Sequence, residues 1–476
     1  MLKLKATALA LSLVTLGACN LAPVVPPFQK PWLELPKFSD EKIAAVDWLR
    51  WWKSFKDPVL DALLAEAALQ SLDLTVASAR IDEARAMLNQ NRANFYPSID
   101  LNAGITRRGN SENAASSRPG IPLNSTDLQY GFVASYEIDF WGKYARADDA
   151  ARARMLNQTA NRGTVLVTLY ANVAQSYFNL RAFDAQLAFA EKTFATRQEN
   201  LKLQERRFSG GVVGDLDVQQ ARSEAASVEA SVLALKQTKR NTESAMALLL
   251  GRKPADIYAP VIARGAAIEA LYEQQVIPAS LPSDILNHRP DVIAAEQNLR
   301  ANNADLALAR TAYYPRLSLS AGLGQQSKEL SNLFSPSSLF WNMIGNLAQP
   351  IFRAGAVDAA VAAATARQTQ AVAQYTQVVQ SAFKEAHDSF NNIEATREIA
   401  ATNKRRIEAL KTTLRLSELR YKGGYSNYLE VLSAQRDLAQ AEISLIDTQR
   451  AELNALVSLY KAAGGGWETS AMTAQK

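Results

Sequence analysis

The prolines of this chain are distributed so unevenly that they constrain its fold more than any other feature of the sequence. No proline lies between Pro122 and Pro254, and none follows Pro350. Proline removes a helical hydrogen bond and its ring clashes with the preceding turn, so it ends or kinks helices. The two proline-free stretches can therefore form very long continuous helices, which a compact enzyme of this length seldom contains.

The composition excludes several classes of function. With 48% hydrophobic and 21% charged residues, the 476-residue chain is not disordered as a whole. One cysteine and two histidines leave too little for a disulfide, a cysteine-rich metal site or zinc catalysis. A formal charge of +5 without a basic block argues against nucleic acid binding. Because no catalytic triad or phosphate loop is visible either, we expect no enzyme, no metal site and no bound cofactor.

The first 18 residues have the features of a secretory signal peptide. Lys3 and Lys5 precede an apolar run from Ala6 to Leu16, which is too short to cross a bilayer as a helix. The run ends in Leu16-Gly17-Ala18-Cys19, a sequence typical of a bacterial lipobox. We therefore predict that residues 1–18 are removed and that Cys19 carries a covalent lipid. The alternative is an ordinary signal peptide followed by a chance cysteine.

The segment after Cys19 contains five prolines between residues 21 and 37, which predict an extended tether. Asn20 follows the cysteine, whereas an aspartate there would resemble a signal for retention at the inner membrane. The sequence therefore favours an anchor in the outer membrane. Apart from the signal peptide, no segment has the uninterrupted apolar length of a transmembrane helix.

The rest of the chain contains an internal repeat. Tyr96-Pro97 recurs as Tyr314-Pro315, and Gly210-Gly211 recurs as Gly423-Gly424. Each half predicts a helix, a β-hairpin and a pair of long helices, so the fold is mainly α with a small β part. The predicted segments are a tether at 19–60, a first repeat at 61–251 (hairpin 98–139, helices 142–251), a linker at 252–287, a second repeat at 288–463 (hairpin 316–349, helices 355–463) and a tail at 464–476.

The long helices carry apolar residues at a sustained spacing of three and four, which is a coiled-coil pattern. The stripe runs from Leu166 to Phe208 in the first half and from Val372 to Tyr421 in the second. A continuous helix from Lys143 to Phe208 would reach roughly 100 Å at about 1.5 Å per residue. The last helix has a second, alanine-rich stripe, which suits helices placed side by side in a curved wall. The alternative is the core of a large helical bundle.

The two hairpins alternate apolar and polar residues over about ten positions, the span of a tilted transmembrane strand. In lipid such strands must close into a barrel, and four strands are too few. Several copies must then share one barrel, and a dimer, trimer or tetramer would each be possible. The soluble alternative is two hairpins packed on the helices.

Two groups of residues near the hairpins are candidates for contact with the membrane or with a lumen. Aromatic residues cluster at the helical end of the strands, as at a membrane interface: Tyr96, Phe140, Trp141 and Tyr314. Glu137 and Asp139 fall on the polar positions of the second strand, where they would either line a lumen or belong to a solvated face.

These features together resemble a known family, the TolC-like outer-membrane factors of Gram-negative tripartite efflux pumps, and in particular its lipoprotein branch typified by OprM. The motifs that carry the resemblance are the lipobox at Cys19, the segment from Tyr136 to Gly142, Arg289-Pro290-Asp291-Val292 and Gly464-Gly465-Gly466-Trp467. The resemblance implies a homotrimer, with a shared barrel of about 12 strands that continues into a periplasmic α-barrel. It also implies an equatorial region formed by residues 24–60, 252–287 and 461–476.

The function implied by the resemblance is conduction. The chain would be the passive exit duct for drugs or other solutes, which an inner-membrane transporter, most often of the RND type, and a periplasmic adaptor hand over. It would be lipid-anchored in the outer membrane and project into the periplasm. Two alternatives stay open: an exit duct for type I protein secretion, and a structural coiled-coil lipoprotein of the periplasm, which would need no membrane strands.

The resemblance also assigns roles to the tips of the helical hairpins, where the family closes its channel. The gate residues are expected at Asp217, Tyr421, Glu430 and Ser433, and the adaptor contact at Gly210, Gly211, Gly214, Gly423 and Gly424. The family's ring of acids falls on Glu430 or on Ser433, and a serine there removes a carboxylate. The simpler role of Asp217 and Glu430 is to stabilise helix N-termini by charge–dipole attraction.

Overall fold

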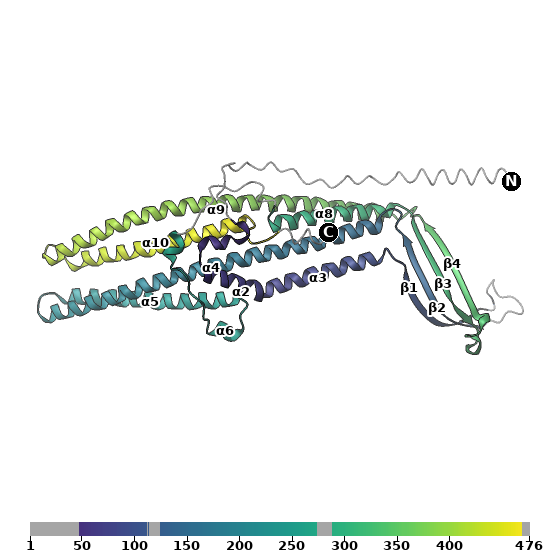
Figure 1. Cartoon of the computed structure of the whole chain (residues 1–476), viewed down its shortest axis with the longest axis horizontal. Coiled ribbons are helices and arrows are strands. Elements are labelled where there is room, and N and C mark those ends of the chain that lie inside the picture. The colour runs from purple at the N-terminus through teal and green to yellow at the C-terminus, as the bar shows by residue number, and fades with distance from the viewer. Residues whose placement is uncertain (1–46, 112, 114–123, 274–287, 469–476) are drawn as a thin grey trace. The chain divides into compact units, whose positions relative to one another are not determined.

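The computed structural model describes residues 47–111, 113, 124–273 and 288–468, which form long helices and one small sheet (Figure 1). Cys19 and the predicted tether as far as residue 46 lie outside the described residues. The elements are η2 (Trp48–Phe55), α2 (Pro58–Gln70), α3 (Leu72–Ala93), β1 (Ser98–Gly109), β2 (Asn124–Ile138), α4 (Lys143–Ser209), α5 (Asp215–Leu249), α6 (Pro254–Tyr258), α7 (Ile268–Glu273), α8 (Pro290–Arg310), η4 (Thr311–Tyr313), β3 (Arg316–Ser327), η5 (Leu330–Asn332), η6 (Pro336–Ser338), β4 (Leu339–Ala348), α9 (Ala356–Lys422) and α10 (Tyr428–Ala462).

The first helix starts earlier than the predicted residue 61 and is interrupted. The Asp57 carboxylate accepts the amide of Val59 at 2.9 Å, which caps α2 ahead of Pro58. The Ser71 hydroxyl accepts the amide of Leu74 at 3.3 Å and separates α2 from α3. Both caps satisfy first-turn amides that have no partner inside the helix. Helix α2 therefore begins inside the segment predicted to precede the first repeat.

The described chain forms two compact units, and each unit draws on both halves of the sequence. Among the described residues, one contains those within 80–158 and 295–375, and the other contains those within 47–79, 159–294 and 376–468. These units differ from the repeats predicted at 61–251 and 288–463. The reason is the length of α4 and α9, which have 67 residues each and contribute to both units.

The first unit contains a four-stranded antiparallel sheet with the order β1-β2-β3-β4. Strands β1 and β4 are the two edges. Near the sheet, Leu88 of α3 packs on Ala151 and Met155 of α4. The ion pair between Arg92 and Asp148, at 2.8 Å, joins the same two helices.

The second unit contains a buried aromatic core. Trp51 of η2 stacks on Tyr460 of α10, with ring centroids 5.1 Å apart, and Phe55 packs on Phe178 of α4 at 4.9 Å. Burial of such large rings contributes about 1.5–3 kcal/mol per side chain. Short helix α7 adds Leu271 to the buried residues. The core therefore holds segments from the start, middle and end of the described chain.

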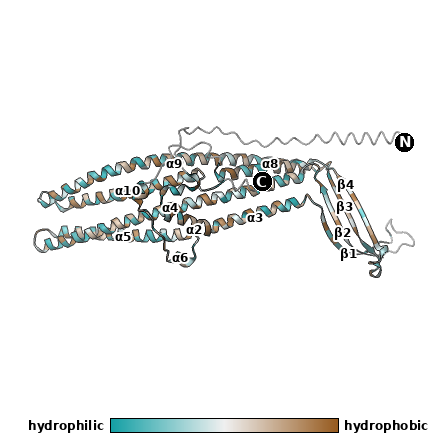
Figure 2. Cartoon of the chain, in the orientation of Figure 1, coloured by the Kyte–Doolittle hydropathy of each residue, from teal (hydrophilic) through white to brown (hydrophobic). Residues whose placement is uncertain are grey.

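Two helical hairpins extend through the second unit, α4 with α5 and α9 with α10 (Figure 1). The return helices α5 and α10 have 35 residues each. Figure 2 shows hydrophilic and hydrophobic residues interspersed along the helices. Within the described residues, none of the helices is both long enough and apolar enough to cross a membrane.

Candidate functional site

The strand register gathers apolar side chains on one face of the sheet. Leu101, Phe132, Leu323 and Trp341 form one row across the four strands. Their exposed fractions are 63%, 55%, 55% and 76%, so the described part of the chain leaves them largely uncovered. The neighbouring row of this face is Ile99, Ala134, Ala321 and Met343. An exposed apolar face of this extent marks a surface that meets lipid or another protein.

The opposite face of the sheet is mainly polar or small. Asn102 lies opposite Gly131, and Ser135 lies opposite Ser320 on the next strand pair. Gly131 and Gly324 are packed so closely that a Cβ on Gly131 would lie 2.7 Å from the Cα of Gly324. The two faces thus differ in chemistry as the alternation in the sequence predicts.

The edges of the sheet carry unpaired backbone groups. Among the described residues, β1 pairs only with β2, and β4 pairs only with β3. An open edge is a template for another strand, and in lipid each unpaired group costs several kcal/mol. A sheet with an apolar exposed face and two open edges is therefore incomplete as a single chain.

The two predicted lumen acids lie at the junction of β2 and α4. Glu137 is on the polar face of β2 and accepts hydrogen bonds from Lys143 Nζ at 2.8 Å and from the Tyr144 hydroxyl at 3.1 Å. Asp139 is not a strand residue, contrary to the prediction, because β2 ends at Ile138. Its Oδ2 accepts the amide of Ala145 at 3.0 Å, in the first turn of α4. Asp139 therefore satisfies a helix N-terminus, where first-turn amides lack partners.

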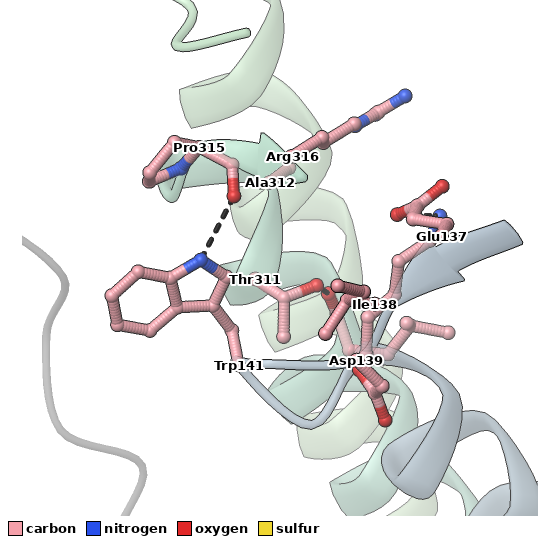
Figure 3. Close-up of a pocket in the computed structure, with 10 residues that line it drawn as sticks. Glu137, Ile138, Asp139, Trp141, Thr311, Ala312, Pro315 and Arg316 are labelled. Atoms are coloured by element: carbon pink, nitrogen blue, oxygen red, sulfur yellow. Dashed lines mark hydrogen bonds and ion pairs between the residues drawn. The ribbon is translucent and has the colours of Figure 1, made fainter. Parts of the chain in front are cut away.

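The predicted interface aromatics form a cluster at this junction. The Trp141 ring stacks on Tyr314 with centroids 4.6 Å apart, and Phe140 meets Trp141 edge-on at 4.8 Å. Figure 3 shows the Trp141 indole N–H directed at the Pro315 carbonyl oxygen, at 2.8 Å. Trp141, Pro315 and Glu137 border a cavity of about 150 Å³. Tyr96 stands apart from this cluster and is 73% exposed.

The tips of the two helical hairpins have the same backbone construction. Gly211 and Gly424 have φ values of +70° and +76°, in the left-handed region that favours glycine. In each tip the amide of the residue after this glycine donates to a carbonyl in the last turn of the long helix. The Val212 amide donates to the Arg207 carbonyl and the Tyr425 amide to the Arg420 carbonyl, both at 2.8 Å. This pattern is a Schellman motif, which ends α4 and α9.

The other predicted adaptor-contact glycines flank these turns. Gly210 and Gly423 precede the left-handed residues and are exposed, as is Gly214, which caps α5 with an extended φ of −81°. A Cβ on Gly210, Gly211 or Gly214 would have no atom closer than 3.5 Å, whereas on Gly423 it would meet the Tyr425 ring at 2.9 Å. The adaptor contact itself stays a prediction.

Tyr421 links the two hairpins near their tips. Its hydroxyl accepts from Arg207 Nη1 at 3.1 Å and from Gln204 Nε2 at 3.4 Å, both on α4. The Arg207 guanidinium also lies over the Tyr421 ring, 5.3 Å from the centroid. The neighbouring Tyr428 ring is 5.5 Å away, and its burial raises the pKa of the Tyr428 hydroxyl.

Among the described residues, no hydrogen bond joins Tyr421 to Asp217, the acid assigned to the same links by family resemblance. The Asp217 amide instead donates to the Gly214 carbonyl at 3.2 Å in the first turn of α5. Asp217 is thus placed at a helix N-terminus, where its negative charge is favourable. Arg207 and Gln204 are the partners of Tyr421 that the sequence interpretation missed. The sequence did contain a clue to Gln204, because a polar residue on the apolar stripe of α4 indicates a polar contact within that stripe.

Glu430 and Ser433 lie in the first turns of α10. Glu430 forms an ion pair with Arg420 of α9 at 3.3 Å, and its amide donates to the Asn427 side chain at 3.3 Å. Ser433 is exposed and supplies a hydroxyl where a carboxylate is expected. The nearby Ser426 has a buried hydroxyl without a hydrogen-bond partner among the described residues. The acid at the tip of this hairpin is therefore Glu430, held by an arginine of its own hairpin.

The described residues contain no group of three or more His, Cys, Asp or Glu side chains that could hold a metal ion. What they present is an exposed apolar sheet face, a cluster of aromatic rings at the end of the strands and long hairpins with polar links at their tips.

Comparison with known proteins agrees with this arrangement. A model of the family described as "Outer membrane efflux protein" matches residues 63–252 and 281–465. The cation efflux system protein CusC of Escherichia coli is 32% identical over 462 residues, covering 96% of this chain and 97% of CusC. The toluene efflux pump outer membrane protein TtgI of Pseudomonas putida is 31% identical over 469 residues, covering 96% of this chain and 98% of TtgI.

Solved structures show the same fold. A crystal structure of CusC superposes with a TM-score of 0.83 at 31% identity, covering 93% of this chain and 100% of that chain. The CmeC outer membrane channel of Campylobacter jejuni also gives a TM-score of 0.83, at 25% identity, covering 94% and 97%. The chain therefore belongs to the outer membrane efflux protein family, a family of outer-membrane transport channels and not of enzymes.

Proposed function

We propose that this protein is the homotrimeric exit duct of a tripartite efflux system. The observation that carries the proposal is the four-stranded sheet, with one exposed apolar face and two open edges. If β4 of one copy pairs with β1 of the next, three copies close a barrel of about 12 strands with no free edge. The polar face, including Glu137, then lines the lumen, and the apolar row at Trp341 meets lipid.

The helical part forms the periplasmic α-barrel in this proposal. Exposed apolar side chains of the return helices, such as Leu233 of α5 and Leu429 of α10, pack against neighbouring copies. The two halves of the sequence act as structural repeats around the trimer axis. The tips at Gly211 and Gly424 receive a periplasmic adaptor, which joins the duct to an inner-membrane transporter of the RND type. The cargo passes without any covalent step.

The lipid anchor is part of the same proposal. Cys19 is the sole cysteine of the chain, and SilC of Salmonella typhimurium, 30% identical over 474 residues, is described as a probable outer membrane lipoprotein. A lipid on Cys19, the first residue after the predicted signal peptide, holds the start of the mature chain to the inner leaflet of the outer membrane.

For the cargo, we propose small organic solutes, as for TtgI, which is described as part of a toluene efflux pump. CusC is described as a cation efflux protein at nearly the same identity. The test uses a bacterial strain that lacks its own outer-membrane factors and is complemented with this chain and a matched pump. Growth of this strain distinguishes organic solutes from metal cations as the cargo. Survival on toluene without survival on silver or copper salts supports organic cargo, and the reverse pattern overturns it.

The duct itself is tested by single-channel recording. The purified protein in planar bilayers is expected to give discrete conductance steps and to run as a trimer in native electrophoresis. Trp341→Asp, on the apolar face, is expected to give no steps, and Asn342→Asp, its neighbour on the polar face, is expected to keep them. The absence of any pore from wild-type protein that carries its lipid would contradict the proposal.

A further inference from the structure

Polar contacts join the hairpins α4/α5 and α9/α10 at several levels, and of the two levels nearest the tips only the outermost contains a predicted gate residue. That level is the Tyr421 hydroxyl with its partners on α4. The second level lies at Arg197, ten residues before Arg207, which is about 15 Å along α4. Here Arg197 of α4, Glu224 of α5 and Arg436 of α10 form a chain of charges.

Glu224 is the centre of this chain of charges. Its Oε1 lies 3.6 Å from Arg197 Nε, and its Oε2 lies 3.5 Å from Arg436 Nε. The side chain of Arg197 also donates to Oε1 of Gln435, next to Arg436 on α10. The Arg197–Glu224 contact is inside one hairpin, whereas the contacts with α10 join the two hairpins.

The three charged side chains differ in burial. Arg197 is 5% exposed and Glu224 is 12% exposed, while Arg436 is 54% exposed. Burial lowers the pKa of Arg197, the effect expected when a guanidinium loses water. A buried cation without a counter-charge is strongly destabilising, so Arg197 depends on Glu224. Arg436, by contrast, can exchange its carboxylate partner for water at little cost.

We propose that Glu224 is a positioning residue of the periplasmic gate, which holds Arg436 when the hairpins are together and releases it when they separate. Arg197 keeps Glu224 as its partner in both states, so opening never leaves a buried charge uncompensated. The proposal rests on the duct function proposed above. At this level, the ion pair between Glu224 and the exposed Arg436 is the contact that favours the closed state.

The opening step then follows from the geometry. At the Arg197 level, separation of the hairpins breaks two contacts, Arg436–Glu224 and Arg197–Gln435, and leaves Arg197–Glu224 intact within α4/α5. Loss of one such exposed ion pair shifts the open–closed equilibrium of one subunit by about threefold. If three subunits open together, the effects multiply to roughly 30-fold. Loss of Arg436 therefore favours the open state, and loss of Glu224 damages the hairpin itself.

The test compares three variants. Arg436→Ala removes one of the contacts between the hairpins and leaves Arg197–Glu224 in place, whereas Glu224→Gln removes the charge that Arg197 needs. Arg222→Ala is the matched control, because Arg222 pairs with Glu205 at 3.2 Å within α4/α5 and both side chains are exposed. The readouts are single-channel open probability, hydrogen exchange of the tip amides and the thermal unfolding midpoint.

We expect Arg436→Ala to raise the ratio of open to closed time by roughly 30-fold and to speed exchange of the tip amides, with an unchanged unfolding midpoint. We expect Glu224→Gln to lower the midpoint by at least about 5 °C. Arg222→Ala should match wild type in all three measurements.

Two outcomes overturn this proposal. One is that Arg436→Ala matches Arg222→Ala in both open probability and tip exchange, and the other is that Glu224→Gln unfolds at the wild-type temperature. If wild-type protein forms no pore, the duct function fails. Hydrogen exchange and the unfolding midpoint then still decide whether Glu224 holds the hairpins together.

Discussion

The hydroxyl of Tyr177, in the middle of α4, donates to Oδ2 of Asp57, the residue that caps α2, over 2.6 Å. The same carboxylate accepts the amide of Ala266 at 3.2 Å, and the Tyr177 oxygen accepts the amide of Gly265 at 3.0 Å. Asp57 is 1% exposed, so these donors replace the water that its charge would otherwise bind. Three segments far apart in the sequence thus meet at one buried carboxylate.

The first prediction concerns this contact. Tyr177→Phe removes one donor from a buried carboxylate, and we expect it to lower the free energy of unfolding by about 1–3 kcal/mol. Tyr170→Phe is the control, since the Tyr170 hydroxyl has no hydrogen-bond partner among the described residues. Denaturant unfolding followed by tryptophan fluorescence measures both. Equal stability of the two variants would show that the Asp57 contact contributes nothing.

The second prediction concerns the close approach of Gly265 to Asp57. A Cβ at residue 265 would lie 2.2 Å from Asp57 Oδ1, a distance that forces the carboxylate away from its donors. We expect Gly265→Ala to destabilise the protein at least as much as Tyr177→Phe. Gly214→Ala, where a Cβ meets nothing within 4 Å, should change the unfolding midpoint little. A harmless Gly265→Ala would mean that the carboxylate can move freely.

The third prediction is a pH dependence at Glu452, which is 1% exposed on α10. Burial raises the pKa of this carboxyl, although the bonded Arg397 opposes the shift. A raised pKa means that the neutral carboxyl stabilises the fold at a pH below the unfolded value of about 4.3. That contribution is lost as the pH rises through the folded pKa.

Glu452→Gln mimics the neutral form, so it should stabilise the protein at pH 7–8 relative to wild type, with a difference that vanishes near pH 4. Urea unfolding across this pH range measures the effect. Glu408→Gln, at a side chain that is 73% exposed, should leave the pH profile unchanged. A Glu452→Gln variant that is less stable than wild type at pH 8 would show that the Arg397 pair outweighs burial.

The elements of the fold follow from local patterns in the sequence. The observed strands β1 to β4 lie where the sequence alternates, and helices α4 and α9 lie where it has three–four spacing, because both patterns are properties of neighbouring residues. The site depends on residues that only the fold brings together. Neither the capping role of Asp139 nor the bonds from Arg207 to Tyr421 can be deduced from spacing.

The fourth prediction tests the two faces of the sheet. Leu101 belongs to the exposed apolar row, and Asn102 follows it on the polar face. If this row meets lipid, as proposed, Leu101→Lys places a charge in the bilayer, which costs about 2–4 kcal/mol near its centre. We expect a large loss of protein from the outer-membrane fraction, measured by quantitative blotting. Asn102→Lys should insert normally, and equal insertion of the two variants would contradict the assignment of the faces.

The last prediction concerns the acid that Ser433 lacks. In a trimer one residue near the tip appears three times, so Ser433→Asp would create a ring of three carboxylates beside Glu430. A ring of negative charge attracts cations into a pore and repels anions. We expect the cation-to-anion permeability ratio of the purified channel to rise about two- to fivefold at low salt, and the gain to shrink in 1 M salt because the Debye length falls to about 3 Å.

The matched control for this change is Ser227→Asp, which adds the same charge to an exposed position of α5. Glu430→Gln should shift the permeability ratio in the opposite direction, since it removes the carboxylate that remains at this tip. Reversal potentials in a salt gradient measure all three variants. If the cation-to-anion permeability ratio responds equally to Ser433→Asp and Ser227→Asp, Ser433 lies away from the narrow part of the pore. Glu430 is then the remaining candidate for the ring of carboxylates.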